Sequence, residues 1–218
     1  VKTLYDKRDQ LDLTGAEVKL LEDTHRDFVR AGAQLSEDEK QRMRAINQRL
    51  STLTTQFQEN LLELTKERSV LVENEAMLDG LSDDRIAAAK QAASSQDKEG
   101  YLLTITNTTR VPILKELSNR ELRQRVWEAS AYRGIGENGG IDNRPLILEI
   151  VKLRAERADL LGYENHAAYK LDPQTAKTPE NALDMLTDLI PPVIENTNQE
   201  KAAIKAMMEK DGIEDEVK

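Results

Sequence analysis

The regular spacing of apolar residues between Met43 and Leu71 constrains the fold of this chain more than any other feature. Large apolar side chains recur there at intervals of mostly three and four residues, which is the repeat of an amphipathic helix. No Gly or Pro interrupts the pattern before Gly80. The pattern therefore predicts one helix from about Glu37 to about Glu73, which at 1.5 Å per residue would be about 55 Å long.

The chain as a whole is short of turn-forming residues, which predicts long helices elsewhere as well. Only 10 glycines and 6 prolines occur in 218 residues, about half the usual share, so the sequence encodes few turns and long elements. Side chains that cap helices recur along the chain, at Thr14 with Glu17, Ser36 with Glu39, Ser82, Asn119, Asn143, and Thr178 before Pro179. We expect an all-α fold, with long antiparallel helices in an irregular bundle. Pro191 and Pro192 should kink the last helix.

One segment is typical of a strand instead. Residues 101–106 read Tyr-Leu-Leu-Thr-Ile-Thr and are bounded by Gly100 and by Asn107. Aromatic and β-branched residues between turn residues predict a short strand. A single strand leaves backbone groups unpaired, so it needs a partner, either in sequence outside this chain, in a second copy, or in a short pairing elsewhere in the chain.

Composition excludes several classes of protein. The 31 Lys and Arg against 40 Asp and Glu give a net charge of −9, and basic residues such as Arg42 and Arg44 alternate with acidic ones, so no nucleic-acid partner is expected. No apolar stretch approaches 18 residues, so no membrane partner is expected either. The absence of cysteine excludes disulfides and thiolate chemistry, and with no secretion signal it predicts a cytoplasmic location. Because the chain starts at Val1 and not at Met, it can also be an excised piece.

No residue stands out as catalytic. The two histidines, His25 and His166, are about 140 positions apart, so they cannot form a zinc-binding pair on one helix. His166 could in principle join a carboxylate as ligand or base, but a residue that orders the start of a helix is the simpler interpretation. The Gly-rich loop at 134–140 has no strand before it and no Gly-Lys-Ser/Thr motif after it, which argues against phosphate binding. We assign no catalytic, cofactor-binding or metal-binding residue.

The apolar stripe between Met43 and Leu71 has two interpretations. Its spacing would allow two chains to pair as a coiled coil, although the flanking positions show no clear charge pattern. Packing within one chain's helical bundle is the default. A free-standing helical or coiled-coil interaction module without enzymatic activity therefore remains the alternative function. A cofactor-binding helical bundle lacks the Glu-x-x-His pairs that such sites use.

Five strings together resemble a known enzyme family. They are LLEDTHRDFVRAGAQLS at 20–36, TNTTRVP at 106–112, NRELRQRVWEAS at 119–130, DNRPLILEIVKLRAERADLLGYENHAAYKL at 142–171 and AKTPENAL at 176–183. The chain is similar to bacterial peptidyl-dipeptidases, also called dipeptidyl carboxypeptidases, of the thimet-oligopeptidase family of zinc metallopeptidases. Related oligopeptidases share the pattern of the LRAERADLLGY segment at 153–163, whereas the RDFVRAGA and TNTT segments of the first two strings point more narrowly to the peptidyl-dipeptidase branch.

The resemblance implies a hydrolase that removes C-terminal dipeptides from short peptides with the help of zinc. The family's metal and catalytic residues lie in an H-E-x-x-H helix and a downstream glutamate, and this sequence contains neither. It matches only the N-terminal helical half, so the piece alone should be inactive and would form part of the wall of the substrate channel. The resemblance divides it into an N-terminal helical region at 1–98 and the start of the peptidase-family helical region at 99–218. Such a piece should self-associate, through an exposed strand edge or through its long helices.

Overall fold

The computed structural model describes residues 1–136 and 140–213, and its described part folds into two compact units. One unit joins residues 1–35 to residues 155–218, and the other contains residues 36–154. The first unit therefore combines segments from both ends of the chain. The expected division into regions 1–98 and 99–218 stays a prediction.

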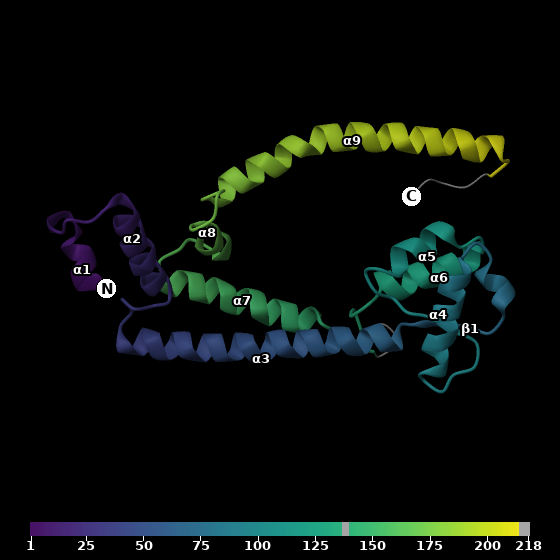
Figure 1. Cartoon of the computed structure of the whole chain (residues 1–218), viewed down its shortest axis with the longest axis horizontal. Helices are drawn as coiled ribbons and strands as arrows, with labels where there is room; N and C mark the ends of the chain where they lie inside the picture. Colours follow the sequence, from purple (N-terminus) through teal and green to yellow (C-terminus); the bar gives the residue numbers. More distant parts are fainter. Residues whose placement is uncertain (137–139, 214–218) are drawn as a thin grey trace. The chain divides into compact units, whose positions relative to one another are not determined.

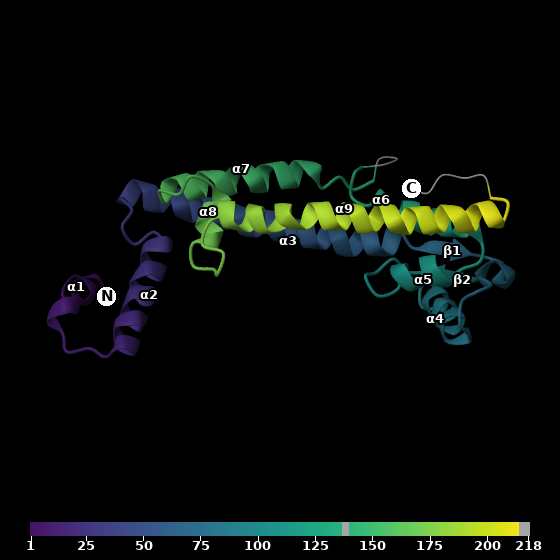
Figure 2. The same cartoon turned by 90° about the horizontal axis from the view of Figure 1, so that it is seen from above.

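Helix α3 (Glu37–Glu67) is the longest element of the 36–154 unit. Ser36 caps it, because its Oγ accepts a hydrogen bond from the Glu39 backbone N–H while the Glu39 carboxylate accepts one from the Ser36 N–H. Its buried residues repeat every three or four positions and are Met43, Ile46, Leu50, Leu53 and Leu64. Helix α7 (Arg144–Leu160) begins in this unit, and its part up to Arg154 runs beside α3 (Figures 1 and 2). The chain's amphipathic stripe is therefore packed inside the chain.

The predicted end of the long helix is wrong by six residues. Helix α3 stops at Glu67, and Val70–Val72 form strand β1 instead of a further helical turn. Strand β1 pairs antiparallel with β2 (Tyr101–Leu103), with Val70 opposite Leu103 and Val72 opposite Tyr101. The strand predicted at 101–106 therefore exists in shortened form. Of the three possible sources of its partner, the chain itself supplies it.

A hydrophobic core surrounds this small sheet. It is formed by helix α4 (Asp83–Ser94), the 3-10 helix η2 (Glu75–Leu78), helix α5 (Arg110–Glu116) and helix α6 (Arg120–Ala131), which gather at one end of the unit (Figure 2). Its members include Leu78, Leu122 and Val126, none of which is exposed to solvent. Asn119 caps α6 as predicted, through its Oδ1 and the Leu122 N–H. Ser82 precedes α4 as predicted, but its side chain makes no capping hydrogen bond.

Gly80 allows a close contact at the edge of this core. Its φ of +95° lies in the left-handed region, and a Cβ atom there would lie 2.1 Å from the carbonyl oxygen of Glu116. The neighbouring Asp79 carbonyl accepts a hydrogen bond from the Ser118 N–H at 2.8 Å. The turn before α4 is therefore joined to the end of α5 at a distance that only glycine permits.

The other unit is made of shorter helices and one long one. It contains α1 (Lys2–Asp6), the 3-10 helix η1 (Arg8–Gln10), α2 (Gly15–Arg30), α8 (His166–Leu171) and α9 (Pro179–Lys210), together with the last turns of α7. Thr14 and Glu17 form the predicted capping box at the start of α2. Thr178 caps α9 through the Asn181 N–H, with Pro179 in the first helical position.

Helix α9 is continuous across Pro191 and Pro192. The sharp kink predicted there is replaced by a gradual curve of the axis (Figure 1). Among the described residues, no helix is both long and apolar enough to cross a bilayer. The predicted all-α fold with a short strand is confirmed. Residues 137–139 of the Gly-rich loop and residues 214–218 of the charged end lie outside the described part.

Candidate functional site

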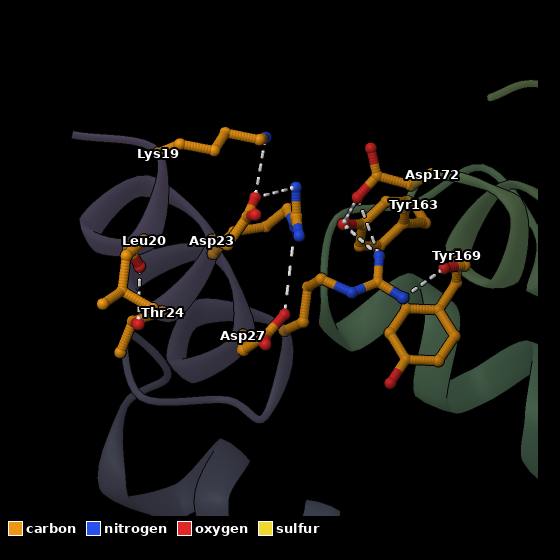
Figure 3. A network of polar contacts seen from close by, with 10 residues as sticks. Lys19, Leu20, Asp23, Thr24, Asp27, Tyr163, Tyr169 and Asp172 are labelled. Carbon is orange, nitrogen blue, oxygen red and sulfur yellow. Dashed lines mark hydrogen bonds and ion pairs between the residues drawn. The ribbon is translucent and has the colours of Figure 1, made fainter. Parts of the chain in front are cut away.

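In the unit formed by residues 1–35 and 155–218, a cluster of polar and aromatic side chains surrounds Arg30, the last residue of α2. Its Nη1 donates hydrogen bonds to the Tyr163 Oη at 2.9 Å and to the Asp172 Oδ2 at 2.8 Å. Its Nη2 donates to the backbone carbonyl of Tyr169 at 2.6 Å. Figure 3 shows Tyr163, Tyr169 and Asp172 converging on this point. One guanidinium thus joins the end of α2 to both ends of α8.

Aromatic rings enclose the same guanidinium. Its central carbon lies 4.4 Å from the ring centre of Tyr169 and 5.5 Å from that of Tyr163, and the two rings meet edge to face at 5.4 Å. Arg157 stacks on Tyr169 as well, at 5.3 Å. Because ring faces attract cations, these contacts add to the hydrogen bonds. The Arg30 side chain is only 12% exposed, so the guanidinium is shielded from solvent, whereas the Asp172 side chain is 40% exposed.

Tyr163 and Asp172 complete the network. The Tyr163 hydroxyl donates to the Asp172 Oδ2 at 3.0 Å, so this carboxylate oxygen accepts from both Arg30 and Tyr163. Burial raises the pKa of the Tyr163 hydroxyl, and its hydrogen bond to Asp172 raises it further. A tyrosine in this setting stays protonated as a hydrogen-bond donor. The arrangement fixes α8 in place, and it presents no activated nucleophile or base.

Among the described residues, neither histidine belongs to a group that could hold a metal ion. His25 stacks on Tyr5 with ring centres 3.8 Å apart and an angle of 5° between the planes. His166 is the first residue of α8 and lies beside Tyr169, at 6.2 Å between ring centres. The helix start is capped by its neighbour Asn165, whose Oδ1 accepts the Ala168 N–H.

The described residues do not fit zinc. In residues 1–136 and 140–213, no three His, Asp or Glu side chains are grouped so that they could hold a metal ion. We therefore assign no zinc ligand to this part of the chain and derive no chemical step through the ion.

Polar contacts between α3 and the start of α7 set the geometry of the 36–154 unit. Arg49 and Glu149 form a two-pronged ion pair, with Nε to Oε1 at 2.5 Å and Nη2 to Oε2 at 2.7 Å. The Asn60 amide donates to the Oδ1 of Asn143 at 2.7 Å, and Asn143 is 3% exposed. Asn143 was predicted to cap α7, and the structure shows its side-chain oxygen bonded to α3.

A polar hollow of about 560 Å³ lies between β1 and α6. Its rim includes Arg125, which donates a hydrogen bond to the Leu71 carbonyl at 3.1 Å, and Tyr132, whose carbonyl accepts one from Arg68 at 3.3 Å. Arg125 thus bonds a backbone carbonyl of β1, and Arg68 bonds a backbone carbonyl directly after the last residue of α6. The Arg125 side chain therefore gives the free edge of the sheet partial cover.

The sequence comparisons relate this chain to peptidases. Residues 113–218 match the sequence model of the family described as Peptidase family M3. Dipeptidyl carboxypeptidase of Escherichia coli strain K12 is 34% identical over 211 residues, which cover 96% of this chain and 31% of that protein. Oligopeptidase A of Salmonella typhimurium is 35% identical over 208 residues, which cover 94% of this chain and 31% of that protein. The chain thus spans about a third of the length of these relatives.

Proposed function

We propose that this chain, which is similar to the Peptidase family M3 sequence model over residues 113–218, is the helical, non-catalytic part of a cytoplasmic zinc metallopeptidase that removes C-terminal dipeptides from short peptides. The observation that carries the proposal is the similarity to dipeptidyl carboxypeptidase along 96% of the chain. The long helices α3 and α7 would serve as one wall of the channel that admits the peptide. Zinc and the groups that transfer protons would come from sequence outside residues 1–218.

The contacts inside each unit support a scaffold role. Arg30 pairs with Asp172 in one unit, and Arg49 pairs with Glu149 in the other. A rigid helical wall needs such contacts between its segments.

The branch within the family is the finer part of the proposal. Dipeptidyl carboxypeptidase and oligopeptidase A match this chain at 34% and 35% identity, so identity does not separate them. The strings at 20–36 and 106–112 favour the first. A carboxypeptidase that releases dipeptides needs a free C-terminal carboxylate on its substrate, whereas an enzyme that cleaves within peptides does not.

The reading frame that encodes this chain provides the first test. We expect it to continue beyond Lys218 and to encode an H-E-x-x-H motif. The product of the whole frame, assayed with zinc, should release dipeptides from a short peptide with a free C-terminus and should leave the same peptide intact when its C-terminus is amidated. Equal cleavage of both peptides would move the assignment to an oligopeptidase. A stop codon directly after Lys218 would favour the alternative, a free-standing helical interaction module.

A further inference from the structure

Helix α6 carries the chain's single tryptophan on its surface. The Trp127 side chain is 52% exposed, although α6 contributes Leu122 and Val126 to the core of this unit. Its ring meets that of Tyr132 edge to face, with 5.9 Å between the ring centres. Tryptophan is among the residue types most enriched at the energetic centre of protein interfaces. The exposed ring therefore marks a surface where a partner could bind.

Positive charge surrounds this tryptophan. Residues 110–133 carry six Lys and Arg against three Glu, a net charge of +3 in a chain whose total is −9. Arg123 precedes Trp127 by four residues and Ser130 follows it by three, so both lie on its side of α6. Arg110 of α5 reaches the same side, because its Nη1 donates a hydrogen bond to the Ser130 Oγ at 2.8 Å. Arginines from two helices thus flank one exposed ring.

Uncharged groups hold these two arginines in place. Arg110 donates to a serine hydroxyl, and Arg123 donates to the backbone carbonyls of Leu117 and Ser118 at 2.5 and 2.8 Å. Such acceptors fix the position of a guanidinium but do not cancel its charge. The two charges are therefore available to a carboxylate that approaches from solvent.

The three glutamates of residues 110–133 are directed elsewhere. At 100° per residue, Glu128 and Glu121 lie about 100° and 120° around the axis of α6 from Trp127. Glu116 pairs with Arg85, at 2.9 Å from the Arg85 Nε. The positive charge of this segment is therefore concentrated on the side of Trp127.

We propose that the face formed by Arg110, Arg123 and Trp127, called the Trp127 face below, binds an acidic peptide segment of a partner protein. The carboxylates of the segment would pair with the two guanidinium groups, and an apolar side chain between them would cover the exposed ring. This inference stands apart from the proposed enzymatic function, because it requires neither zinc nor peptide cleavage.

Charge also limits the kind of partner. A membrane or a nucleic acid presents an extended anionic surface, which the chain's net charge of −9 would repel. A short acidic segment meets mainly the local positive charge, because charges are screened beyond about 8 Å at physiological ionic strength. The Trp127 face therefore fits a peptide segment better than a larger anion.

Trp127 fluorescence measures binding directly, because the chain has no other tryptophan. The probe is the peptide acetyl-Glu-Asp-Leu-Asp-Glu-amide, and the matched control is acetyl-Gln-Asn-Leu-Asn-Gln-amide. We expect the acidic peptide to change the emission of the 218-residue chain with a Kd below about 1 mM, and to bind more weakly as salt is added. The uncharged peptide should bind roughly tenfold more weakly.

Variants test whether the peptide binds at the Trp127 face. Arg110→Gln removes one charge from the face and should weaken binding roughly two- to fivefold. Arg44→Gln removes the same charge from an exposed position on α3 and should bind like the parent. Trp127→Ala should weaken binding roughly tenfold or more, measured by isothermal titration calorimetry because the fluorophore is lost. If circular dichroism shows that Trp127→Ala has lost helicity, the two arginine variants decide the question.

Four results would each overturn the proposal. They are no binding of the acidic peptide below about 1 mM, equal binding of the two peptides, equal affinities of Arg110→Gln and Arg44→Gln, and binding of phosphatidylserine vesicles that Arg110→Gln weakens in place of peptide binding. The last result would assign the Trp127 face to a membrane surface.

Discussion

The guanidinium of Arg30 lies 2.8 Å from the carboxylate of Asp172, although 142 positions separate the two residues in the sequence. This contact closes the unit formed by the two ends of the chain, because Arg30 ends α2 and Asp172 follows α8. The same guanidinium reaches Tyr163 and the backbone of Tyr169. One side chain thus determines how two distant segments meet.

Replacing Arg30 should loosen this junction. Lysine keeps the positive charge but has no planar fork, so Arg30→Lys loses at least one of the three hydrogen bonds and part of the ring stacking. Hydrogen bonds to charged groups contribute about 1.5–3 kcal/mol, and we expect a loss of this order in the free energy of unfolding. Hydrogen exchange should show faster exchange in α8 and at the end of α2.

The exposed Arg44 on α3 provides the control. Arg44→Lys makes the same chemical change on a solvent-facing helix surface, and its effect should stay within about 0.5 kcal/mol. Equal stability of Arg30→Lys and Arg44→Lys in urea would contradict the role given to Arg30.

The core beside the sheet should be sensitive to truncation. Leu122 is fully buried, so Leu122→Ala removes apolar contacts and leaves a cavity, at a cost of about 2–5 kcal/mol. Leu62 is of the same type but is 68% exposed, and Leu62→Ala should change little. Urea unfolding followed by the fluorescence of Trp127, which lies on the same helix as Leu122, reports this difference. Similar midpoints for the two variants would show that the core is not where the structure places it.

Gly80 should tolerate no side chain. Gly80→Ala places a methyl group against the Glu116 carbonyl and demands a left-handed backbone, so we expect a loss of about 1–3 kcal/mol or more. Gly15→Ala is the matched substitution, because nothing lies within 4 Å of its Cβ position and alanine favours the start of α2. Thermal unfolding should show a lower midpoint for the first variant and an unchanged or higher one for the second. A Gly80→Ala variant with the thermal midpoint of the parent chain would refute the close approach of Gly80 to the Glu116 carbonyl.

The ion pair between Arg49 and Glu149 predicts a dependence of stability on pH. The hydrogen bonds from Arg49 lower the pKa of the Glu149 carboxyl below its usual value of 4.5. A carboxyl whose pKa is lower in the folded state contributes stability that is complete above its unfolded pKa and is lost as the pH falls through the folded pKa. This contribution should therefore disappear below about pH 4.5, and it should be small because both side chains are partly exposed.

Thermal midpoints measured from pH 7 down to pH 3 would show this effect. Glu149→Gln should lower the midpoint slightly at pH 7 and should match the parent chain at the acidic end. A difference that grows as the pH falls would contradict the assigned sign.

The starts of the helices could be predicted because their signals are local. The capping boxes at Thr14 and Ser36 are each contained within four residues, and both form as expected. The end of α3 was harder to predict because Leu71 continues the apolar spacing of the helix by coincidence. Whether residues 70–72 stay helical or pair as a strand depends on residues 101–103, which lie about 30 positions later. The apolar spacing within a short stretch of sequence does not reveal a pairing with a distant strand.

The cluster around Arg30 could not be predicted for the same reason. Its members come from residue 30 and from residues 163–172, and each reads alone as an ordinary surface side chain. The family resemblance, by contrast, could be found from the sequence, because the strings at 142–171 and 176–183 preserve the order of residues along one continuous segment. The chemistry of the family lies outside these strings, so neither sequence nor structure assigns it to residues of this chain.

A peptidase assay with zinc on two proteins side by side tests the central claim most directly. One is the purified 218-residue chain, and the other is the product of the whole reading frame that contains it. The account predicts that the longer protein releases dipeptides from a short peptide and that the 218-residue chain releases none. Dipeptide release by the 218-residue chain itself, abolished by neither repurification nor a change of expression host, would contradict it.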